Sequence, residues 1–332
     1  MKITFFSTKP YDKESFNKQN QQFGFELDYY DTHLGPHIIN AVEKTDVVCV
    51  FVNDKVNAPV IEALAKKGVK VIALRCAGYN NVDLTAAKTN RIKVCRVPAY
   101  SPEAVAEHAV AMLLTLNRKT HKAYNRVREQ NFSLNGLLGF DVHKKTVGVI
   151  GTGNIGRAFC KIMLGFGCHV VAYDIAVNKE LEALGVSFLT LSEILSQSDI
   201  ISLHCPLNDQ THHIINSTSI AAMKNGVMLI NTSRGGLIDT KAVIDALKSK
   251  QIGYLGIDVY EQEEKLFFRD LSANIIEDDT IQRLMSFPNV LVTAHQAFFT
   301  MEALQQIADV TLNNIKGLME GKNLVNRAAQ LA

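Results

Sequence analysis

Residues 147–156 read VGVIGTGNIG, a short apolar run followed by three glycines in the order G-x-G-x-x-G. The run Val147–Ile150 has the length and composition of a buried strand, and a helical pattern follows it. Gly151 permits a tight turn, Gly153 lets a pyrophosphate approach the backbone, and Gly156 lets the helix pack close to the strand. The start of the helix offers free N–H groups to phosphates. This stretch therefore predicts a dinucleotide-binding turn.

An acidic residue stands where such a site needs one. The next predicted strand ends at Asp174, close to the spacing of about 20 residues at which an acid binds the adenosine ribose. Asp174 alone could cap a loop, but here strand, glycines, helix, strand and acid occur in order. A carboxylate accepts hydrogen bonds from both ribose hydroxyls and repels a 2′-phosphate. Because Ile175 and Ala176 follow, with no adjacent arginine, we expect NAD(H) rather than NADP(H).

The same alternation of strands and helices extends along the chain. It predicts parallel sheets with helices on both faces. The candidate strands are Ile3–Ser7, Val47–Val52, Val69–Leu74, Ile92–Val97, Val147–Ile150, Val170–Tyr173, Ile200–His204, Val227–Asn231, Leu255–Val259 and Val290–Thr293. A helix starts after Ser101, and a last helix, from about Met301 to Met319, could pack back on the first domain.

We therefore expect an α/β protein of two Rossmann-like, doubly wound parallel-sheet domains with a cleft between them. One domain would be residues 1–100 plus 299–332, and the other residues 101–298.

Composition limits the function. The 332 residues are 47% hydrophobic and carry a net charge of +2, so no basic field suggests nucleic-acid binding. The basic stretch Asn117–Arg128 fits a solvated helix face better. The six cysteines form no CxxC pair and are expected to be reduced, buried thiols. With no secretory signal pattern and no apolar run of about 20 residues, we expect a cytoplasmic protein without a membrane partner.

Three polar residues follow later strands of the second series: Arg234, Glu263 and His295. The carboxyl ends of parallel strands face the ligand crevice. Reduction of a 2-keto acid needs a cation for the carboxylate, a proton donor for the carbonyl oxygen and an acid that orients the donor, roles that suit Arg, His and Glu. Singly, each could be a surface charge or a core histidine. Their combination favours catalysis.

With these residues in place, the sequence resembles the D-isomer-specific 2-hydroxyacid dehydrogenases. The resemblance runs essentially end to end and places the family's catalytic residues on Arg234, Glu263 and His295. Within the family, the chain is most similar to the fermentative D-lactate dehydrogenases. The matching stretches are VGVIGTGNIG (147–156), ISLHCPL (201–207), MKNGVMLINTSRGGLID (223–239), GIDVYEQE (256–263) and TAHQAF (293–298), with RCAGYNNVDL (75–84), VPAYSPEAVAEHA (97–109) and the insert after Glu263 indicating the subgroup.

The resemblance implies further contacts. The NAD pyrophosphate would meet Asn154 and Ile155, its adenine Cys205 and Pro206, and its nicotinamide end Thr232, Ser233 and Asp258. The backbone N–H groups of Ala77 and Gly78 would hold the substrate carboxylate with Arg234, and Tyr100 and Phe298 would wall the pocket. Whether Thr211 contacts the cofactor, as an Asn does in some relatives, stays open.

The resemblance also implies a function: reduction of pyruvate to D-lactate by NADH, in a homodimer or homotetramer, with no metal. Two alternatives stay open. One is the same chemistry on a bulkier 2-keto acid. The other is an NAD(H)-sensing binding protein similar to certain transcriptional corepressors, which share the fold and the three residues.

Overall fold

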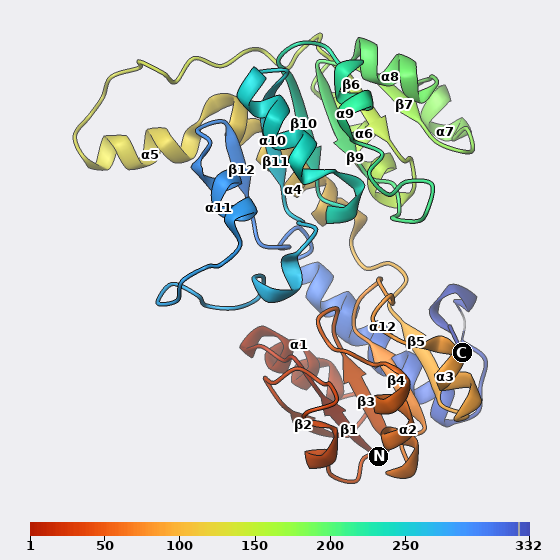
Figure 1. Ribbon diagram of the computed structural model, residues 1–332. Coiled ribbons are helices and arrows are strands. Elements are labelled where there is room, and N and C mark those ends of the chain that lie inside the picture. Colours follow the sequence, from red (N-terminus) through yellow and green to blue (C-terminus); the bar gives the residue numbers. More distant parts are fainter. Residues whose placement is uncertain (325) are drawn as a thin grey trace. The chain divides into compact units, whose positions relative to one another are not determined.

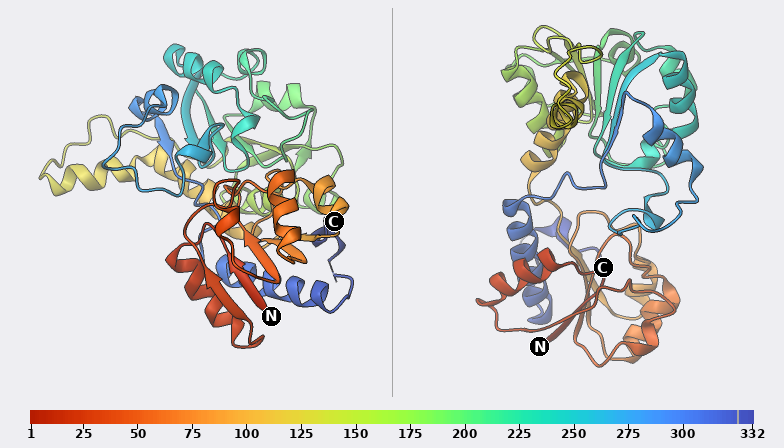
Figure 2. Two further views of the ribbon diagram at one scale, coloured as in Figure 1. Left: turned by 60° about the horizontal axis from the view of Figure 1, so that its bottom comes forward. Right: turned by 90° about the vertical axis from the view of Figure 1, so that its left-hand side faces the viewer.

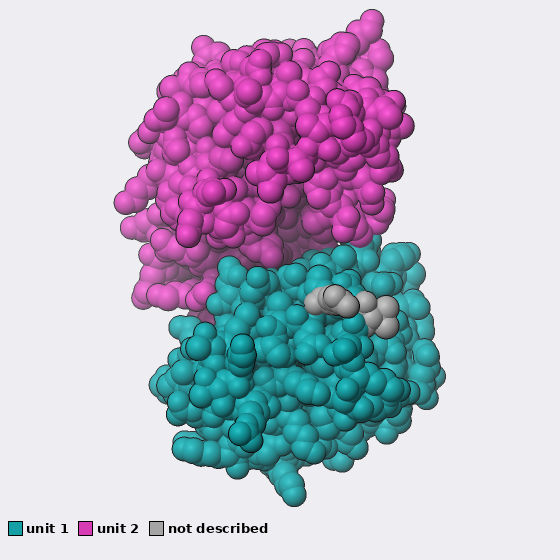
Figure 3. Space-filling view, turned by 90° about the vertical axis from the view of Figure 1, so that its right-hand side faces the viewer, with its two compact units in different colours: residues 1–101, 299–332 teal, residues 102–298 magenta. Residues whose placement is uncertain are grey.

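The computed structural model describes residues 1–324 and 326–332, which form two compact units. Unit 1 comprises residues 1–101 and 299–332, and unit 2 comprises residues 102–298 (Figure 3). Within the described residues, no helix has the length and apolar character needed to cross a membrane. All six cysteines are buried.

Unit 1 is built on a parallel sheet in the order β2-β1-β3-β4-β5. Strands β3 and β4 are buried along their whole length, since helices cover both faces (Figure 1). The C-terminal helix α12 returns to this unit and packs on α1, β4 and β5. The strands are β1 (Lys2–Phe5), β2 (Glu26–Tyr29), β3 (Val47–Val50), β4 (Val71–Leu74) and β5 (Lys93–Arg96), and the helices are α1 (Pro10–Asn20), α2 (Ala58–Lys66), α3 (Leu84–Thr89) and α12 (Met301–Met319), with short 3-10 turns η1 (Ile39–Ala41) and η4 (Arg327–Ala329).

Unit 2 is built on a parallel sheet in the order β12-β11-β10-β9-β6-β7-β8. The order reverses between β6 and β9, the position at which doubly wound sheets bind their ligands. The strands are β6 (Thr146–Ile150), β7 (His169–Tyr173), β8 (Ser187–Phe188), β9 (Ile200–Leu203), β10 (Val227–Asn231), β11 (Ile252–Ile257) and β12 (Val290–Val292).

Two layers of helices cover this sheet (Figure 2). Helices α4 and α6 pack together on one face, and α8, α9, α10 and α11 form the other layer. The helices are α4 (Pro102–Arg118), α5 (Thr120–Arg128), α6 (Asn154–Gly165), α7 (Lys179–Ala183), α8 (Leu191–Gln197), α9 (Ser217–Ala221), α10 (Thr240–Ser249) and α11 (Asp279–Ser286), with 3-10 turns η2 (Gly235–Leu237) and η3 (Glu263–Lys265). The predicted α/β class with doubly wound parallel sheets is confirmed.

Two strands were not predicted from the sequence, one in each sheet. Because β8 was missed, the sheet of unit 2 has seven strands where six were expected. Strand β8 has only two residues, and β2 is a partly exposed edge strand whose sequence ELDY lacks an apolar run. The predicted end of β1 was also wrong, because the chain turns at Ser7, which has a positive φ of 56°. Short polar edge strands leave little periodic signal.

Candidate active site

The glycine turn between β6 and α6 is held by close backbone packing. Gly151 has φ +94°, and a Cβ there would lie 2.5 Å from the Cys205 nitrogen. A Cβ at Gly156 would lie 1.9 Å from the Gly151 carbonyl oxygen. Gly153, the N-cap of α6, faces open space, with nothing within 4 Å of its Cβ position. The turn therefore demands glycine at two positions for packing and leaves the third open to a ligand.

The next residues fit a phosphate at this turn. Asn154 and Ile155 are the first residues of α6, a helix of 12 residues. The N–H groups of a first helical turn have no partner within their own helix, and they lie at the positive end of its dipole. An anion beside Gly153 would therefore meet these groups.

Asp174 lies directly after β7 and contacts the same turn. Its carboxylate accepts hydrogen bonds from the Thr152 backbone nitrogen (2.6 Å), the Thr152 hydroxyl (2.8 Å) and the Ile175 nitrogen (2.7 Å). Partial burial alone would raise the pKa of Asp174, but these hydrogen bonds outweigh it and hold the pKa below the usual range. The group is therefore an anion at neutral pH, as recognition of ribose hydroxyls requires.

The loop after β9 borders the glycine turn. The Cys205 carbonyl accepts a hydrogen bond from the Ser233 hydroxyl at 2.7 Å, so two of the predicted cofactor residues meet. The Pro206 carbonyl accepts one from the Thr211 hydroxyl at 2.6 Å, which uses that hydroxyl within the loop. Beside Ser233, the buried Thr232 hydroxyl has no hydrogen-bond partner among the described residues. An orphaned donor in this position fits a bound nicotinamide nucleotide.

His204 was not singled out from the sequence. Its side chain is fully buried, and burial lowers its pKa from 6.5 to about 3, so the imidazole is neutral. One ring nitrogen pairs with the Ser202 hydroxyl at 2.8 Å, and the Phe159 ring lies 4.9 Å away. The His204 side chain also packs against the turn, since a Cβ at Gly156 would lie 3.3 Å from the Cβ of His204. His204 thus supports the cofactor turn from below.

Glu263 and His295 form a hydrogen-bonded pair. Nδ1 of His295 lies 2.8 Å from Oε1 of Glu263, and the two side chains are 20% and 18% exposed. The other carboxylate oxygen, Oε2, accepts the Tyr260 backbone N–H at 3.0 Å. Because the Nδ1–H group of His295 donates to Glu263, Nε2 is the ring nitrogen that can carry a transferable proton.

The backbone at His295 is held in the left-handed region, with φ +52°. Such a conformation costs energy for a non-glycine residue and persists only where the surroundings enforce it. The His295 nitrogen donates to the Asp258 carbonyl (2.7 Å), and the Asp258 carboxylate accepts the Gln296 and Ala297 nitrogens (2.9 Å each). Asp258 therefore fixes the turn that carries the histidine.

Asp258 is completely buried and has two further partners that sequence reasoning missed. Its carboxylate accepts the Thr293 hydroxyl at 2.5 Å and lies 3.5 Å from Nε2 of His108 on α4. Burial alone would raise the pKa of Asp258, but the hydrogen bonds from His108, Thr293 and the backbone lower it below the usual range. The resemblance assigned Asp258 to the nicotinamide end; the structure also gives it an anchoring role.

Arg234 lies beyond β10 with its charge uncompensated. Its guanidinium donates to the Ser233 carbonyl at 2.7 Å and forms no ion pair with the part of the chain that the structure describes. The Arg234 carbonyl accepts the Asn231 side-chain amide at 2.9 Å, which fixes the turn. Because its backbone is fixed and its guanidinium has no carboxylate partner among the described residues, Arg234 is suited to bind the carboxylate of a ligand.

The other predicted substrate residues lie mostly in unit 1. Ala77 and Gly78 follow β4, and Tyr100 precedes α4. Phe298 is buried and is the last residue of unit 2. Among residues 1–324 and 326–332, no group of three or more His, Cys, Asp or Glu side chains could hold a metal ion.

A buried arginine stands at the end of β4, just before Ala77 and Gly78, and was missed by sequence reasoning. Arg75 is 1% exposed, donates to the Ser7 carbonyl at 2.8 Å and lies 3.3 Å from the Asp12 carboxylate. A fully buried charge must be paired, and these contacts tie the exit of β4 to the exit of β1. No sequence pattern separates such an arginine from an exposed one.

Known proteins resemble this chain in sequence and fold. The NAD-binding domain of the D-isomer-specific 2-hydroxyacid dehydrogenases matches residues 110–297. The chain belongs to this family. Members of the family are NAD-dependent enzymes, and the glycine turn, Asp174 and the orphaned Thr232 hydroxyl fit NAD as the cofactor of this one.

Relatives match the chain over nearly its whole length. The D-lactate dehydrogenase of Escherichia coli is 52% identical over 326 residues, which cover 98% of this chain and 99% of that protein. The 2-hydroxyacid dehydrogenase homolog 1 of Schizosaccharomyces pombe is 55% identical over 324 residues, or 97% and 98% of the two chains.

Solved structures agree with these matches. The apo-structure of the E. coli D-lactate dehydrogenase has a TM-score of 0.92 at 49% identity and covers 100% of both chains. A D-lactate dehydrogenase from Aquifex aeolicus, complexed with NAD and lactic acid, has a TM-score of 0.85 at 35% identity and covers 96% of each.

Two glycines of the turn give a matched pair of variants. Gly156→Ala would force a methyl group against the Gly151 carbonyl, so we expect a loss of about 1–3 kcal/mol of unfolding free energy and of NADH binding. Gly153→Ala has open space and a compatible φ of −62°, so it should weaken NADH binding while thermal stability is kept. Calorimetry and NADH titration measure both. Equal stability of the two variants would contradict this packing.

Asp174 should set the choice of cofactor. Asp174→Ala removes the charged acceptor for the ribose hydroxyls and the repulsion of a 2′-phosphate. We expect kcat/KM for NADH to fall roughly 10- to 100-fold, the scale of a charged hydrogen bond, and the preference over NADPH to narrow. Wild-type turnover with NADPH equal to that with NADH would show that Asp174 does not bind the ribose.

Proposed function

We propose that this protein is a D-lactate dehydrogenase that reduces pyruvate to D-lactate with NADH. The observation that carries the proposal is the pair of His295 and Glu263, joined at 2.8 Å after β12 and β11. Arg234 follows β10, and its guanidinium has no ion pair with the described residues. The full-length similarity to D-lactate dehydrogenases supports this choice of substrate.

The glycine turn and Asp174 would hold NADH, which would supply a hydride to C2 of the keto acid and leave as NAD⁺. The guanidinium of Arg234 binds the substrate carboxylate with two parallel hydrogen bonds, joined by the backbone N–H groups of Ala77 and Gly78. Protonated His295 gives its Nε2 proton to the carbonyl oxygen as the C=O bond becomes C–O–H. Glu263 orients the ring through Nδ1 and stabilises the imidazolium until the proton is transferred.

The remaining predicted residues complete the proposal. Asn154 and Ile155 receive the pyrophosphate, and Cys205 and Pro206 border the adenine. Thr232, Ser233 and Asp258 face the nicotinamide end. Tyr100 and Phe298 wall the substrate pocket. Residues 1–100 with 299–332 would form the substrate-binding domain and residues 101–298 the NAD-binding domain.

We also propose that the protein is a homo-oligomer, a dimer or a tetramer. Helix α5 has no buried residue and projects away from the sheet of unit 2, and the chain after it loops back toward β6 (Figure 1). Large apolar side chains lie exposed along α5 and this chain: Tyr124 (62%), Phe132 (72%), Leu134 (80%) and Leu138 (87%). Such an apolar series suits a second copy of the chain. The molar mass in solution, from light scattering, tests this. The cysteines are buried and form no disulfide among the described residues, which suits the reducing cytoplasm.

The activity test is NADH oxidation with pyruvate, followed by chiral analysis of the product. We expect rapid turnover and D-lactate alone. The same assay with phenylpyruvate and 2-ketoisocaproate compares bulkier substrates, which we expect to have lower kcat/KM. L-Lactate as the product would refute the proposal, and a higher kcat/KM for a bulky acid would make that acid the substrate.

Arg234→Lys is the variant that links this activity to the site. It keeps the charge but loses the planar fork, so kcat/KM for pyruvate should fall by roughly 3 kcal/mol in transition-state terms, the scale of a charged hydrogen bond. Affinity for NADH should hardly change. If the wild-type protein bound NADH but turned over no 2-keto acid, that result would favour the NAD(H)-sensing alternative.

Variants of Glu263 and His295 test the roles of these two residues, with kcat for pyruvate reduction as the measurement. Reduction needs a proton on Nε2 of His295 for the carbonyl oxygen of the substrate. Glu263→Gln keeps the shape but removes the negative charge that stabilises the imidazolium, so kcat for pyruvate reduction should fall. His295→Ala removes the proton donor and should lower kcat by about 10²–10⁴-fold.

Glu264→Gln is the matched control, since Glu264 is an exposed neighbouring acid without a hydrogen bond or ion pair to the described residues. Its kcat should coincide with that of the wild type. An unchanged kcat in Glu263→Gln would mean that this carboxylate does not stabilise the proton donor.

A further inference from the structure

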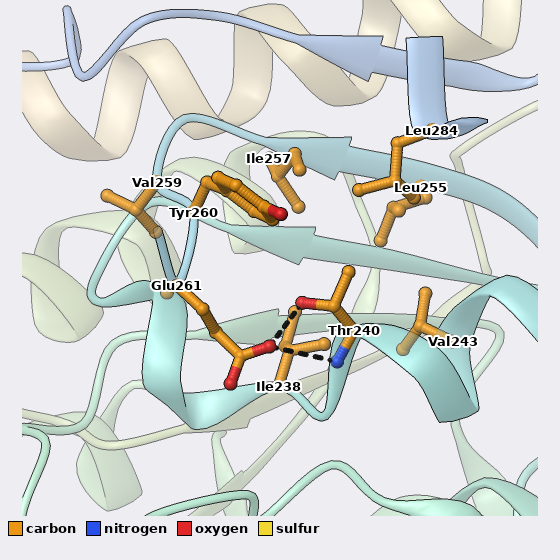
Figure 4. A pocket seen from close by; sticks show the side chains of 10 residues that line it. Ile238, Thr240, Val243, Leu255, Ile257, Val259, Tyr260, Glu261 and Leu284 are labelled. Atoms are coloured by element: carbon orange, nitrogen blue, oxygen red, sulfur yellow. Dashed lines mark hydrogen bonds between the residues drawn. The ribbon is translucent and has the colours of Figure 1, made fainter. Parts of the chain in front are cut away.

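The Glu261 carboxylate joins three segments that follow different strands. Its Oε1 lies 2.7 Å from Nε2 of His213, in the loop after β9. Its Oε2 accepts the Thr240 hydroxyl at 2.5 Å and the Thr240 nitrogen at 3.2 Å, in the segment after β10 (Figure 4). Glu261 itself follows β11. Since all these strands are parallel, the three segments share the carboxyl edge of the sheet, where the ligands of such folds bind.

Backbone packing beneath this carboxylate leaves little freedom. A Cβ at Gly235 would lie 2.1 Å from the Tyr260 carbonyl carbon and 2.4 Å from the Glu261 nitrogen. The residue after Arg234 therefore rests directly on the backbone of Glu261. The cavity that Glu261 and Thr240 help to line has a volume of about 10 Å³, room for about one water molecule. This place is therefore a joint between segments and cannot hold a substrate.

This joint lies between Arg234, which would bind the substrate carboxylate, and the Glu263–His295 pair, which would supply the proton. On one side, the segment tied through Thr240 begins with Arg234 and Gly235. On the other side, the Tyr260 N–H donates to the Glu263 carboxylate, which holds His295. A shift of the Glu261 turn would therefore change the spacing between the arginine and the proton-donating pair.

The geometry points to Glu261 as a positioning residue that sets the spacing between Arg234 and the Glu263–His295 pair. The inference rests on the proposed function. The Glu261 and His213 side chains are 27% and 33% exposed, so their contact adds little to overall stability. Thr240 begins α10, a helix of 10 residues, where a carboxylate is favourable near the free N–H groups. These contacts hold a local geometry, which should appear in kinetics more than in stability.

The test compares Glu261→Ala, Glu261→Gln and Glu264→Ala by steady-state kinetics with pyruvate and by NADH titration. Glu261→Ala should raise the pyruvate KM at least about tenfold, because small misplacements of binding groups are costly, with kcat less affected. Glu261→Gln should recover a large part of this loss, since its amide oxygen still accepts from Thr240. Glu264→Ala should match the wild type, and all variants should bind NADH within about twofold of it.

A role confined to stability predicts another result. Glu261→Ala would then show a lower melting temperature with unchanged pyruvate KM, and the inference would be overturned. Should that variant fail to fold, Thr240→Val removes only the hydroxyl bond and should still raise the pyruvate KM; an unchanged KM there would overturn the inference as well.

The two proposals fail separately. If Arg234→Lys raises the pyruvate KM and Glu261→Ala does not, the positioning role fails and the proposed function stands. If the wild type turns over no 2-keto acid, the proposed function fails and the positioning role with it.

Discussion

The active site depends on one buried carboxylate. Asp258 has no exposed surface, and a charge so buried must be neutralised by hydrogen bonds. Its donors come from the chain after β12 and from His108 on α4, so satisfying the charge forces the Gln296 and Ala297 nitrogens to converge on one point. The backbone at His295 is driven into the left-handed region as a result. The histidine then reaches Glu263 from a turn that has no freedom to relax.

Much of this could be predicted from the sequence because it is encoded locally. The glycine spacing, the acid at Asp174 and the apolar runs of the inner strands each reflect a short-range requirement of turn, strand or helix. Strands β2 and β8 could not be predicted, because a polar or two-residue edge strand has no such pattern. The contact of His108 with Asp258 could not be predicted for another reason. The two residues are 150 positions apart in the sequence, and only the packing of α4 against β10 and β11 brings them together.

Two arginines show why residue type alone does not reveal a role. Arg75 and Arg234 both follow central strands of parallel sheets. Arg75 is buried, with its charge matched by Asp12 and by backbone carbonyls, so its charge is used inside the fold. Arg234 is only partly buried, and its charge meets no carboxylate among the described residues. The sequence identifies Arg234 through the resemblance to a family, whereas the structure identifies it by its uncompensated charge.

The same reasoning sorts the carboxylates at the carboxyl edge of the unit 2 sheet. A carboxylate offers about four acceptor positions, so its existing donors and its burial decide what it can still do. Asp258 is buried and already accepts hydrogen bonds from Thr293, Gln296 and Ala297, so its main role is to hold the turn that carries His295. Asp174 accepts several hydrogen bonds but stays partly accessible, so it can also accept from ribose hydroxyls. One oxygen of Glu263 accepts the Tyr260 backbone N–H and the other pairs with His295. The orientation of the carboxylate is therefore fixed, and its negative charge lies beside the imidazole. Three acids of one sheet edge thus take three roles, because the chain supplies each with a different set of donors.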